Sequence, residues 1–376
     1  MSSRTSKVLY AHLLWAEYLL ILQHLTLSDL RRLGLCCRDG YRAYLREKNF
    51  RQTPLCKLPR GRFLGRSYSH HEKVLVVSYP RSGNSLMRSI LETDTGIITG
   101  SDSRTNRTLS AALLRCGFAG EGVVDDSVWI VKSHYPERMG YISFPTRRVI
   151  LVVRNVFDSM ESYFHMGMTN THDKRLSDPS LQRLKDEGLW DSFIKNECVV
   201  WSDFHKHWVS LAVAAKVHLH IVRYEDLLCE RRAKVVRGAM SFLTTESHAA
   251  PPPRLLKYNP ASTSSGATPE CGAGYDPKPG SVGRALRLLS REQVQQVLDR
   301  CRFFLSHFGY SVVEGGSLHV IPDTDLNPGQ ASHGEVEGVR VNASDSVRGP
   351  DDRFGRRMTH VRRGLTADDT APFQMG

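Results

Sequence analysis

The 376-residue sequence lacks several patterns that would assign a chain to a class at once. It has no C-x-x-C pair, no internal repeat and no basic segment with interleaved aromatic residues. Its eight cysteines are scattered, and only Cys36 and Cys37 are adjacent, so neither a zinc site nor a disulfide framework is indicated. We expect reduced, mostly buried thiols. Without a basic patch or a reader motif, nucleic-acid binding is not expected.

A good membrane-spanning segment is also missing. The stretch from Val8 to Leu27 is apolar but is interrupted by His12, Glu17, Gln23 and His24. Polar and charged side chains are costly within a bilayer, and no small-residue cleavage site follows the stretch. A membrane anchor and a secretory signal are therefore both unexpected.

The formal net charge of +12 is concentrated at the N-terminus. Residues 1–73 hold 14 Lys and Arg against 5 Asp and Glu, whereas residues 74–313 hold 30 against 24 and residues 314–376 hold 7 against 10. The central part of the chain is thus only mildly basic, and its charge alone requires no polyanionic partner.

The N-terminal region, residues 1–71, has a helical pattern. Leucines recur at helical spacing, and Ser28 is placed as a cap before Asp29. Residues 19–47 resemble an F-box, the small helical module that docks on the Skp1 adaptor. The alternatives are an ordinary helical hairpin packed on the next domain, or an anchor.

Residues 72–312 alternate short buried strands with longer helices, which predicts an α/β domain with a parallel sheet wrapped by helices. Nearly continuous apolar character predicts strands that are covered on both faces, at Val74 to Ser78, Val128 to Val131, Val149 to Val153 and Val217 to Val222. Helical patterns cover Ser85 to Glu92, Val156 to Met166, Leu189 to Ala215 and Ser290 to Phe308. Residues 167–187 and 245–283 are expected to be irregular, and residues 313–376 to be a disordered tail.

The stretch from Lys73 to Glu92 contains the most informative motif, a strand, a tight turn with Gly83 and a helix. Backbone N–H groups at such a turn, together with the helix dipole, favour an anionic group. A Walker A loop would need a Lys before Ser85, which the sequence lacks, and the later strands end in Lys132 and Arg154 rather than in an Asp for magnesium. A metal-dependent kinase or GTPase therefore fits badly.

This loop resembles that of the PAPS-dependent sulfotransferases, which use 3'-phosphoadenosine 5'-phosphosulfate (PAPS) and have Y-P-[KR]-[ST]-G-[TN]-[ST] at a strand end. The resemblance covers roughly residues 72–308 and implies a P-loop NTPase-like three-layer sulfotransferase fold. It assigns the 5'-phosphosulfate to Arg81, Ser82, Gly83, Asn84, Ser85 and Leu86.

Further motifs follow in the order that the family shows. Lys132 and His134 are similar to its K-[ST]-H, and a neutral imidazole there is suited to take a proton from an acceptor. Arg154 and Ser162 match its 3'-phosphate motif, an Arg after a strand and a Ser eight positions later. Tyr224 matches its adenine-contacting Tyr, although a Tyr packed on the core would look the same.

A later stretch, "KPGSVGRAL", looks like the glycine loop that closes on the 3'-phosphate in this family. We call residues 278–285 the late loop. The resemblance places Lys278, Gly280, Gly283 and Arg284 at the cofactor, but Ala285 stands where the family commonly has an aromatic residue.

The resemblance implies transfer of a sulfuryl group from PAPS to a hydroxyl or amine of a small-molecule or glycan acceptor, without a metal. His134 would be the general base, and Arg81 and Lys132 would stabilise the leaving nucleotide. The open alternatives are an F-box-type adaptor with an inactive sulfotransferase-like domain, and an ATP-dependent phosphotransferase. We expect a cytoplasmic protein, with a Golgi type II membrane protein as the alternative.

Overall fold

A computed structural model of the protein describes residues 60–64, 72–103, 108–137, 144–245, 282–313, 317–322, 326, 339–341 and 370–371. The F-box-like segment, residues 19–47, lies outside the described residues, and so does most of the predicted tail.

The centre of the structure is a five-stranded sheet in which every neighbouring pair is parallel. Its spatial order is β2 (Gly100–Ser101), β3 (Ile130–Ser133), β1 (Val74–Ser78), β5 (Arg148–Val153) and β7 (His218–Arg223). All five residues of β1 are buried. Leu75 and Val77 join one hydrophobic cluster, while Val74 and Val76 join another, because alternate side chains of a strand point to opposite faces. The four strands expected from apolar runs are confirmed.

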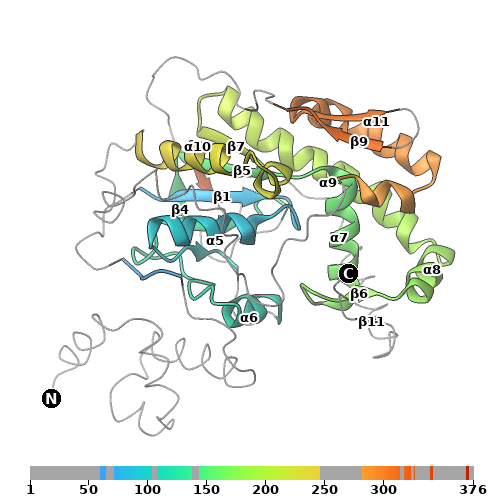
Figure 1. Ribbon diagram of the computed structural model, residues 1–376, viewed down its shortest axis with the longest axis horizontal. Helices are drawn as coiled ribbons and strands as arrows, with labels where there is room; N and C mark the ends of the chain where they lie inside the picture. The colour runs from blue at the N-terminus through green and yellow to red at the C-terminus, as the bar shows by residue number, and fades with distance from the viewer. Residues whose placement is uncertain are drawn as a thin grey trace, which may run out of the picture.

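Helices cover both faces and make three layers, as Figure 1 shows. One face packs against α5 (Asn84–Thr95) and α10 (Arg232–Thr245). The other packs against α7 (Val156–Thr169), α9 (Leu189–Val213) and α11 (Arg291–His307). The predicted α/β class, a parallel sheet wrapped by helices, is therefore confirmed.

Local capping chemistry explains where two of these helices begin. The Asn155 side chain accepts a hydrogen bond from Asp158 N at 2.9 Å and caps α7. Ser290 and Gln293 form the capping box expected at the start of α11, each side chain accepting from the other's backbone N–H.

The segment 167–187 is more regular than expected. After the end of α7 it holds β6 (Arg175–Leu176) and α8 (Asp178–Asp186), whose cap is Ser177. Helix α8 is short, and only Leu181 and Leu184 among its apolar side chains are buried, so its helical periodicity is weak in the sequence. The sequence analysis also did not foresee the helix α10 or the short elements β2, α6 (Thr108–Arg115) and β4 (Phe144–Thr146).

Ordered structure also continues past residue 312, where the sequence analysis placed the end of the domain. β8 (Tyr310–Val313) pairs antiparallel with β9 (Ser317–Val320), and Leu318 is buried in the core. Two further short strands, β10 (Val339–Val341) and β11 (Thr370–Ala371), pair with β4 and β6. Buried Leu318 and Tyr310, whose hydroxyl donates to Glu225 Oε2 at 2.6 Å, attach the hairpin to the domain.

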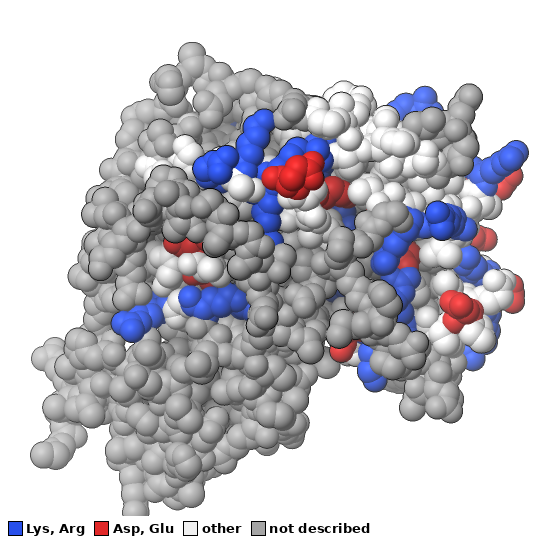
Figure 2. Space-filling model, viewed as in Figure 1, with Lys and Arg blue, Asp and Glu red and all other residues white. Residues whose placement is uncertain are grey.

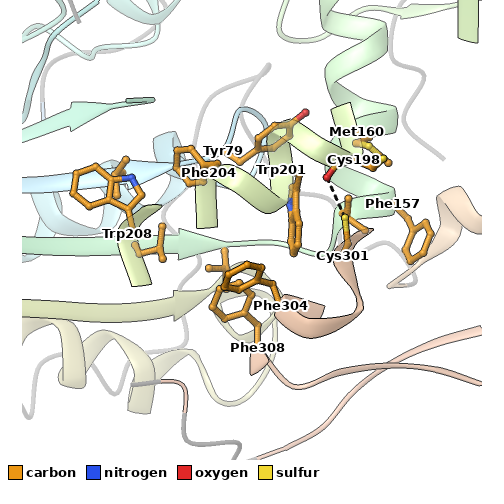
Figure 3. Close-up of a cluster of buried hydrophobic side chains, with 14 of the residues drawn as sticks. Tyr79, Phe157, Met160, Cys198, Trp201, Phe204, Trp208, Cys301, Phe304 and Phe308 are labelled. Atoms are coloured by element: carbon orange, nitrogen blue, oxygen red, sulfur yellow. Dashed lines mark hydrogen bonds between the residues drawn. The ribbon is translucent and has the colours of Figure 1, made fainter. Parts of the chain in front are cut away.

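Aromatic side chains fill the interface between α9 and α11. In Figure 3, Trp201 and Phe204 from α9 lie in one cluster with Phe304 from α11 and Phe308, which directly follows that helix. His205 is enclosed in the same cluster: its Nδ1 donates to Trp201 O at 2.7 Å, and its ring centroid lies 5.1 Å from that of Phe308. Burial lowers the pKa of His205 to about 3, so this histidine packs as a neutral aromatic ring.

On the face that Figure 2 shows, Lys and Arg lie among Asp, Glu and uncharged residues. Within the described part of the chain, no helix is both long enough and apolar enough to cross a membrane.

We expect the free energy of unfolding to fall as the pH is lowered from 6.5. The unfolded chain binds a proton at His205 with a pKa of about 6.5, whereas the folded chain does not until about pH 3, so this stability is present above pH 6.5 and is lost below it. We expect the free energy of unfolding, measured by chemical denaturation at several pH values between 6 and 4, to depend less on pH in H205Q. The slope of this free energy against pH should be lower than in the wild type by about 1.4 kcal/mol per pH unit. The exposed His319 provides the control: H319Q should keep the wild-type slope, and an unchanged slope in H205Q would contradict the assignment.

Candidate functional site

The strand β1 ends at Ser78, and the loop from Pro80 to Gly83 leads directly into α5. Met87 N donates to Gly83 O at 3.0 Å, which is the first bond of the helical pattern, so the N–H groups of residues 84–86 have no partner within the helix. Gly83 has a φ of 97°, in the left-handed region. The loop thus offers several backbone donors at a helix N-terminus, an arrangement that favours anions.

The ring of Tyr224 packs directly on this loop. A Cβ built on Gly83 would lie 2.3 Å from Cδ2 of Tyr224, so only glycine allows the contact. The Arg154 guanidinium lies over the same ring, 4.7 Å from its centroid, and Arg154 Nη1 donates to Arg81 O at 2.9 Å. Residues that follow three different strands therefore meet at one point.

Arg81 is turned towards α7. Its Nε donates to Ser162 Oγ at 2.9 Å, and its Nη2 donates to His172 O at 3.0 Å. Its Nη1 lies 3.2 Å from His172 Nδ1. His172 Nε2 lies 3.1 Å from Leu109 O, which can only accept, so Nε2 carries the proton and Nδ1 accepts from Arg81. Arg81 also has a φ of 65°, uncommon for a residue with a side chain and typical of strained functional loops.

Four arginines, Arg81, Arg154, Arg175 and Arg284, lie close to the buried carboxylate of Glu161. Glu161 forms an ion pair with Arg175, and its Oε2 lies 3.6 Å from Arg284 Nη2. Burial, followed by the nearby charges of Arg284 and Arg81, lowers the pKa of Arg175 to about 10. The same causes lower the pKa of His165 to about 4. Positive charge is therefore crowded at this position, which suits a multiply charged anion.

The end of β3 supplies the other part of the site. His134 Nδ1 lies 2.7 Å from Ser78 O, a carbonyl that can only accept, so Nδ1 carries the proton and Nε2 holds the lone pair. Lys132 is buried in β3, two residues before His134. His134 is thus tied to the end of β1, the strand that leads into the loop.

Asp102, just after β2, orders the chain that carries Lys132 and His134. Its Oδ2 accepts from Ser133 Oγ at 2.5 Å, and Ser133 Oγ in turn accepts from Tyr135 N at 2.9 Å. Asp102 N also donates to Lys132 O at 3.1 Å. Burial raises the pKa of Asp102 to about 6, against the opposing effects of the Ser133 hydrogen bond and Lys132.

Two of the residues assigned to the phosphosulfate have other contacts. The Asn84 amide donates to Val76 O at 3.3 Å, Ser78 Oγ at 3.2 Å and Ser133 O at 3.4 Å, so it ties β1 to β3 instead of adding a donor at the loop. The Leu86 side chain is buried in the core, which leaves only its backbone to face a ligand.

The late loop is described only at its end. Lys278 and Gly280 lie outside the described residues, whereas Gly283 and Arg284 lie beside α7. Ala285, which stands in place of the family's aromatic residue, is fully buried. Its small side chain lets the backbone approach α7 closely.

Sequence reasoning missed Asp102, Glu161, His172 and Arg175. Glu161 directly precedes the predicted site residue Ser162, which is the one hint of its role in the sequence. Its partners Arg175 and Arg284 are distant in the chain. Asp102 and His172 lie in segments without a motif, and no spacing rule connects them to the site. Among the described residues, no group of three or more His, Cys, Asp or Glu side chains is arranged to hold a metal ion.

Comparison with known proteins places this site in a family. Residues 71–257 match the family model described as the sulfotransferase domain. This part of the chain is a sulfotransferase-family domain. The matched residues include the loop after β1, the His134 segment, the pair Arg154 and Ser162, and Tyr224. The match to the family model ends before the late loop.

Curated relatives of the sulfotransferase domain include three WSCD family members of insects. They are 29% identical over 178 residues in Aedes aegypti, 28% over 174 in Drosophila pseudoobscura pseudoobscura and 27% over 168 in Drosophila melanogaster. These matches cover 47%, 46% and 45% of this chain and 52%, 51% and 49% of the relatives. The chain therefore spans about half the length of the curated relatives it matches. Among solved structures, the mouse sulfotransferase SULT7A1 complexed with PAP matches with a TM-score of 0.35 and 15% identity, over 63% of this chain and 87% of that one.

The Asp102 carboxylate is expected to cost stability at neutral pH. Because its folded pKa of about 6 lies above the unfolded value of about 3.9, its contribution is most favourable below pH 3.9 and is lost as the pH rises to 6. D102N should therefore raise the free energy of unfolding by about 2 kcal/mol at pH 7.5 and by much less at pH 4.5. Denaturant titrations at both pH values test this against D203N, an exposed control, and equal effects at the two pH values would contradict it.

The contact between Gly83 and Tyr224 can be separated from backbone strain by a matched substitution. Gly188 also has a positive φ, of 68°, but a Cβ there would meet no atom within 4 Å. G83A should therefore destabilise the protein by about 1–3 kcal/mol more than G188A does, since it adds a steric overlap to the same kind of strain. Thermal unfolding of the two variants decides the point, and equal losses would show that Tyr224 does not press on the loop.

Proposed function

We propose that the domain transfers a sulfuryl group from PAPS to a hydroxyl or amine of a small-molecule or glycan acceptor. The observation that carries this proposal is the contact of Arg81 with both Arg154 and Ser162. The residues that the family motifs assign to the two charged ends of the nucleotide thus lie next to one another.

The donors present fit a doubly phosphorylated nucleotide. Arg81, Arg154 and Arg284 carry guanidinium groups, whose planar sets of donors suit phosphate oxygens. Ser82 Oγ and Arg154 Nε are buried without a hydrogen-bond partner among the described residues, a costly state that an anionic ligand nearby can relieve. Gly83 carries no side chain that would keep a phosphate from the backbone.

In this assignment the 5'-phosphosulfate binds at the N–H groups of residues 83–86. The 3'-phosphate binds at Arg154, Ser162 and the late loop with Arg284, and Tyr224 faces the adenine. PAPS supplies the activated sulfuryl group, and the protein supplies its orientation and the charges around it.

His134 is placed to move the proton. With its proton on Nδ1, the imidazole presents the Nε2 lone pair to an acceptor hydroxyl or amine. As the acceptor atom bonds to sulfur, its proton passes to Nε2. The bond from sulfur to the bridging oxygen breaks, and the nucleotide leaves with that electron pair as 3'-phosphoadenosine 5'-phosphate.

Lys132 and Arg81 would meet the negative charge that grows on the leaving oxygen. Arg81 is bonded to Ser162 and His172 in this structure, so it reaches that oxygen only after its guanidinium leaves those partners. Before that step its contribution is to phosphate binding.

Turnover of labelled PAPS with a panel of acceptors tests the proposal. H134A and R81A should each lower kcat by about 100-fold, since they remove a proton acceptor and a charge that stabilises the transition state. H319A and R287A change exposed residues of the same types and should keep wild-type turnover. Retained turnover in both site variants would refute the assigned roles, and failure of the wild type to bind 3'-phosphoadenosine 5'-phosphate would refute the donor.

A further inference from the structure

One carboxylate near the site takes no part in the proposed chemistry, yet it bonds to the late loop twice. Asp158 lies in the first turn of α7 and is 4% exposed. Its Oδ2 accepts from Gly283 N at 2.8 Å, and its Oδ1 accepts from Ala285 N at 3.1 Å. Both oxygens therefore hold backbone groups of a segment more than 120 residues away in the chain.

Asp158 is also oriented by hydrogen bonds that do not involve the late loop. Asn155 Nδ2 donates to Asp158 Oδ2 at 2.9 Å, and Asp158 N donates to Asn155 Oδ1 at 2.9 Å. Asn155 Nδ2 is held in turn by Glu225 Oε1 at 2.8 Å. Such a reciprocal pair at a helix N-terminus leaves the carboxylate little freedom, so it acts as a rigid acceptor.

The loop is also pressed against Asp158 from the other side. Gly283 has a φ of 77°, and a Cβ built on it would lie 2.5 Å from Cβ of Leu318 in β9. The loop backbone is thus confined between α7 and the β8–β9 hairpin. The residue between the two bonded N–H groups is Arg284, whose Nη2 lies 3.6 Å from Glu161 Oε2. Its charge acts together with that of Arg81 on His165 and Arg175, so it belongs to the arginine cluster.

We propose that Asp158 is a positioning residue that makes the site select nucleotides with a 3'-phosphate, by fastening the late loop so that Arg284 stays within the arginine cluster beside α7. This inference rests on the proposed function, because it takes the 3'-phosphate as the ligand of that cluster. Asparagine at this position keeps the size of the side chain but has a single acceptor oxygen, so it cannot hold both N–H groups.

The test compares two nucleotides that differ at the 3'-position. Isothermal titration calorimetry with 3'-phosphoadenosine 5'-phosphate and with AMP gives the preference for the 3'-phosphate as a ratio of the two Kd values. In D158N the Kd for 3'-phosphoadenosine 5'-phosphate should rise about tenfold, the effect expected for a lost charge-assisted hydrogen bond, while the Kd for AMP stays within about twofold. D191N is the matched control, because Asp191 also lies in the first turn of a helix, α9, but bonds to Gln293 away from the site.

A second measurement separates positioning from general damage to the fold. If Asp158 acts through Arg284, the double variant D158N/R284A should bind 3'-phosphoadenosine 5'-phosphate little more weakly than R284A alone, whereas independent effects would multiply. If D158N keeps the wild-type preference for the 3'-phosphate, the proposed role of Asp158 is overturned and the proposed function stays intact. If D158N raises the Kd values for 3'-phosphoadenosine 5'-phosphate and for AMP equally, the role of Asp158 is overturned as well. If the wild type itself shows no preference for the 3'-phosphate, both proposals are overturned.

Discussion

The parallel pairing of β1 with β3 on one side and β5 on the other is the constraint on which the site depends. Val77 is in register with Ser133, and Ser78 with Val152, so these three strands end at nearly the same level. The carboxyl ends of parallel strands lie at one common edge of the sheet, and ligands of open α/β sheets bind at this edge. Arg81, His134, Arg154 and Tyr224 then need only a few residues of chain beyond their strands to reach one another.

Charge balance is the second organising feature of the site. Arg81, Arg154, Arg175 and Arg284 lie around α7, where the buried carboxylates of Glu161, Asp158 and Glu225 partly balance their charge. Burial, and after it the nearby charges of Arg284 and Arg81, lowers the pKa of Arg175, so holding these cations together in a buried place costs free energy. A site that gathers four arginines is suited to an anion, because binding the anion relieves the repulsion among them.

Much of this arrangement could be read from spacing because the relevant contacts are local. Strand, turn and helix patterns located the loop with Gly83, and the eight-residue separation of Arg154 and Ser162 pointed to two groups on one strand end and helix face. The capping box at Ser290 was equally visible, since its partners are three residues apart. In contrast, the inward direction of the Asn84 amide depends on carbonyl and hydroxyl groups from two strands, which no local pattern reports.

The sequence by itself determined the layered α/β class, the order of the motifs and the residue types at the charged edge, since apolar periodicity and short-range hydrogen bonding dictate these. Only the tertiary structure decided which partners each group takes: Arg81 with Ser162 and His172, Asp102 with Ser133, and Asp158 with the late loop. The physical reason is that hydrogen bonds and desolvation act over a few ångströms in space. Residues far apart in the chain acquire them only when packing of the sheet and helices has brought them together.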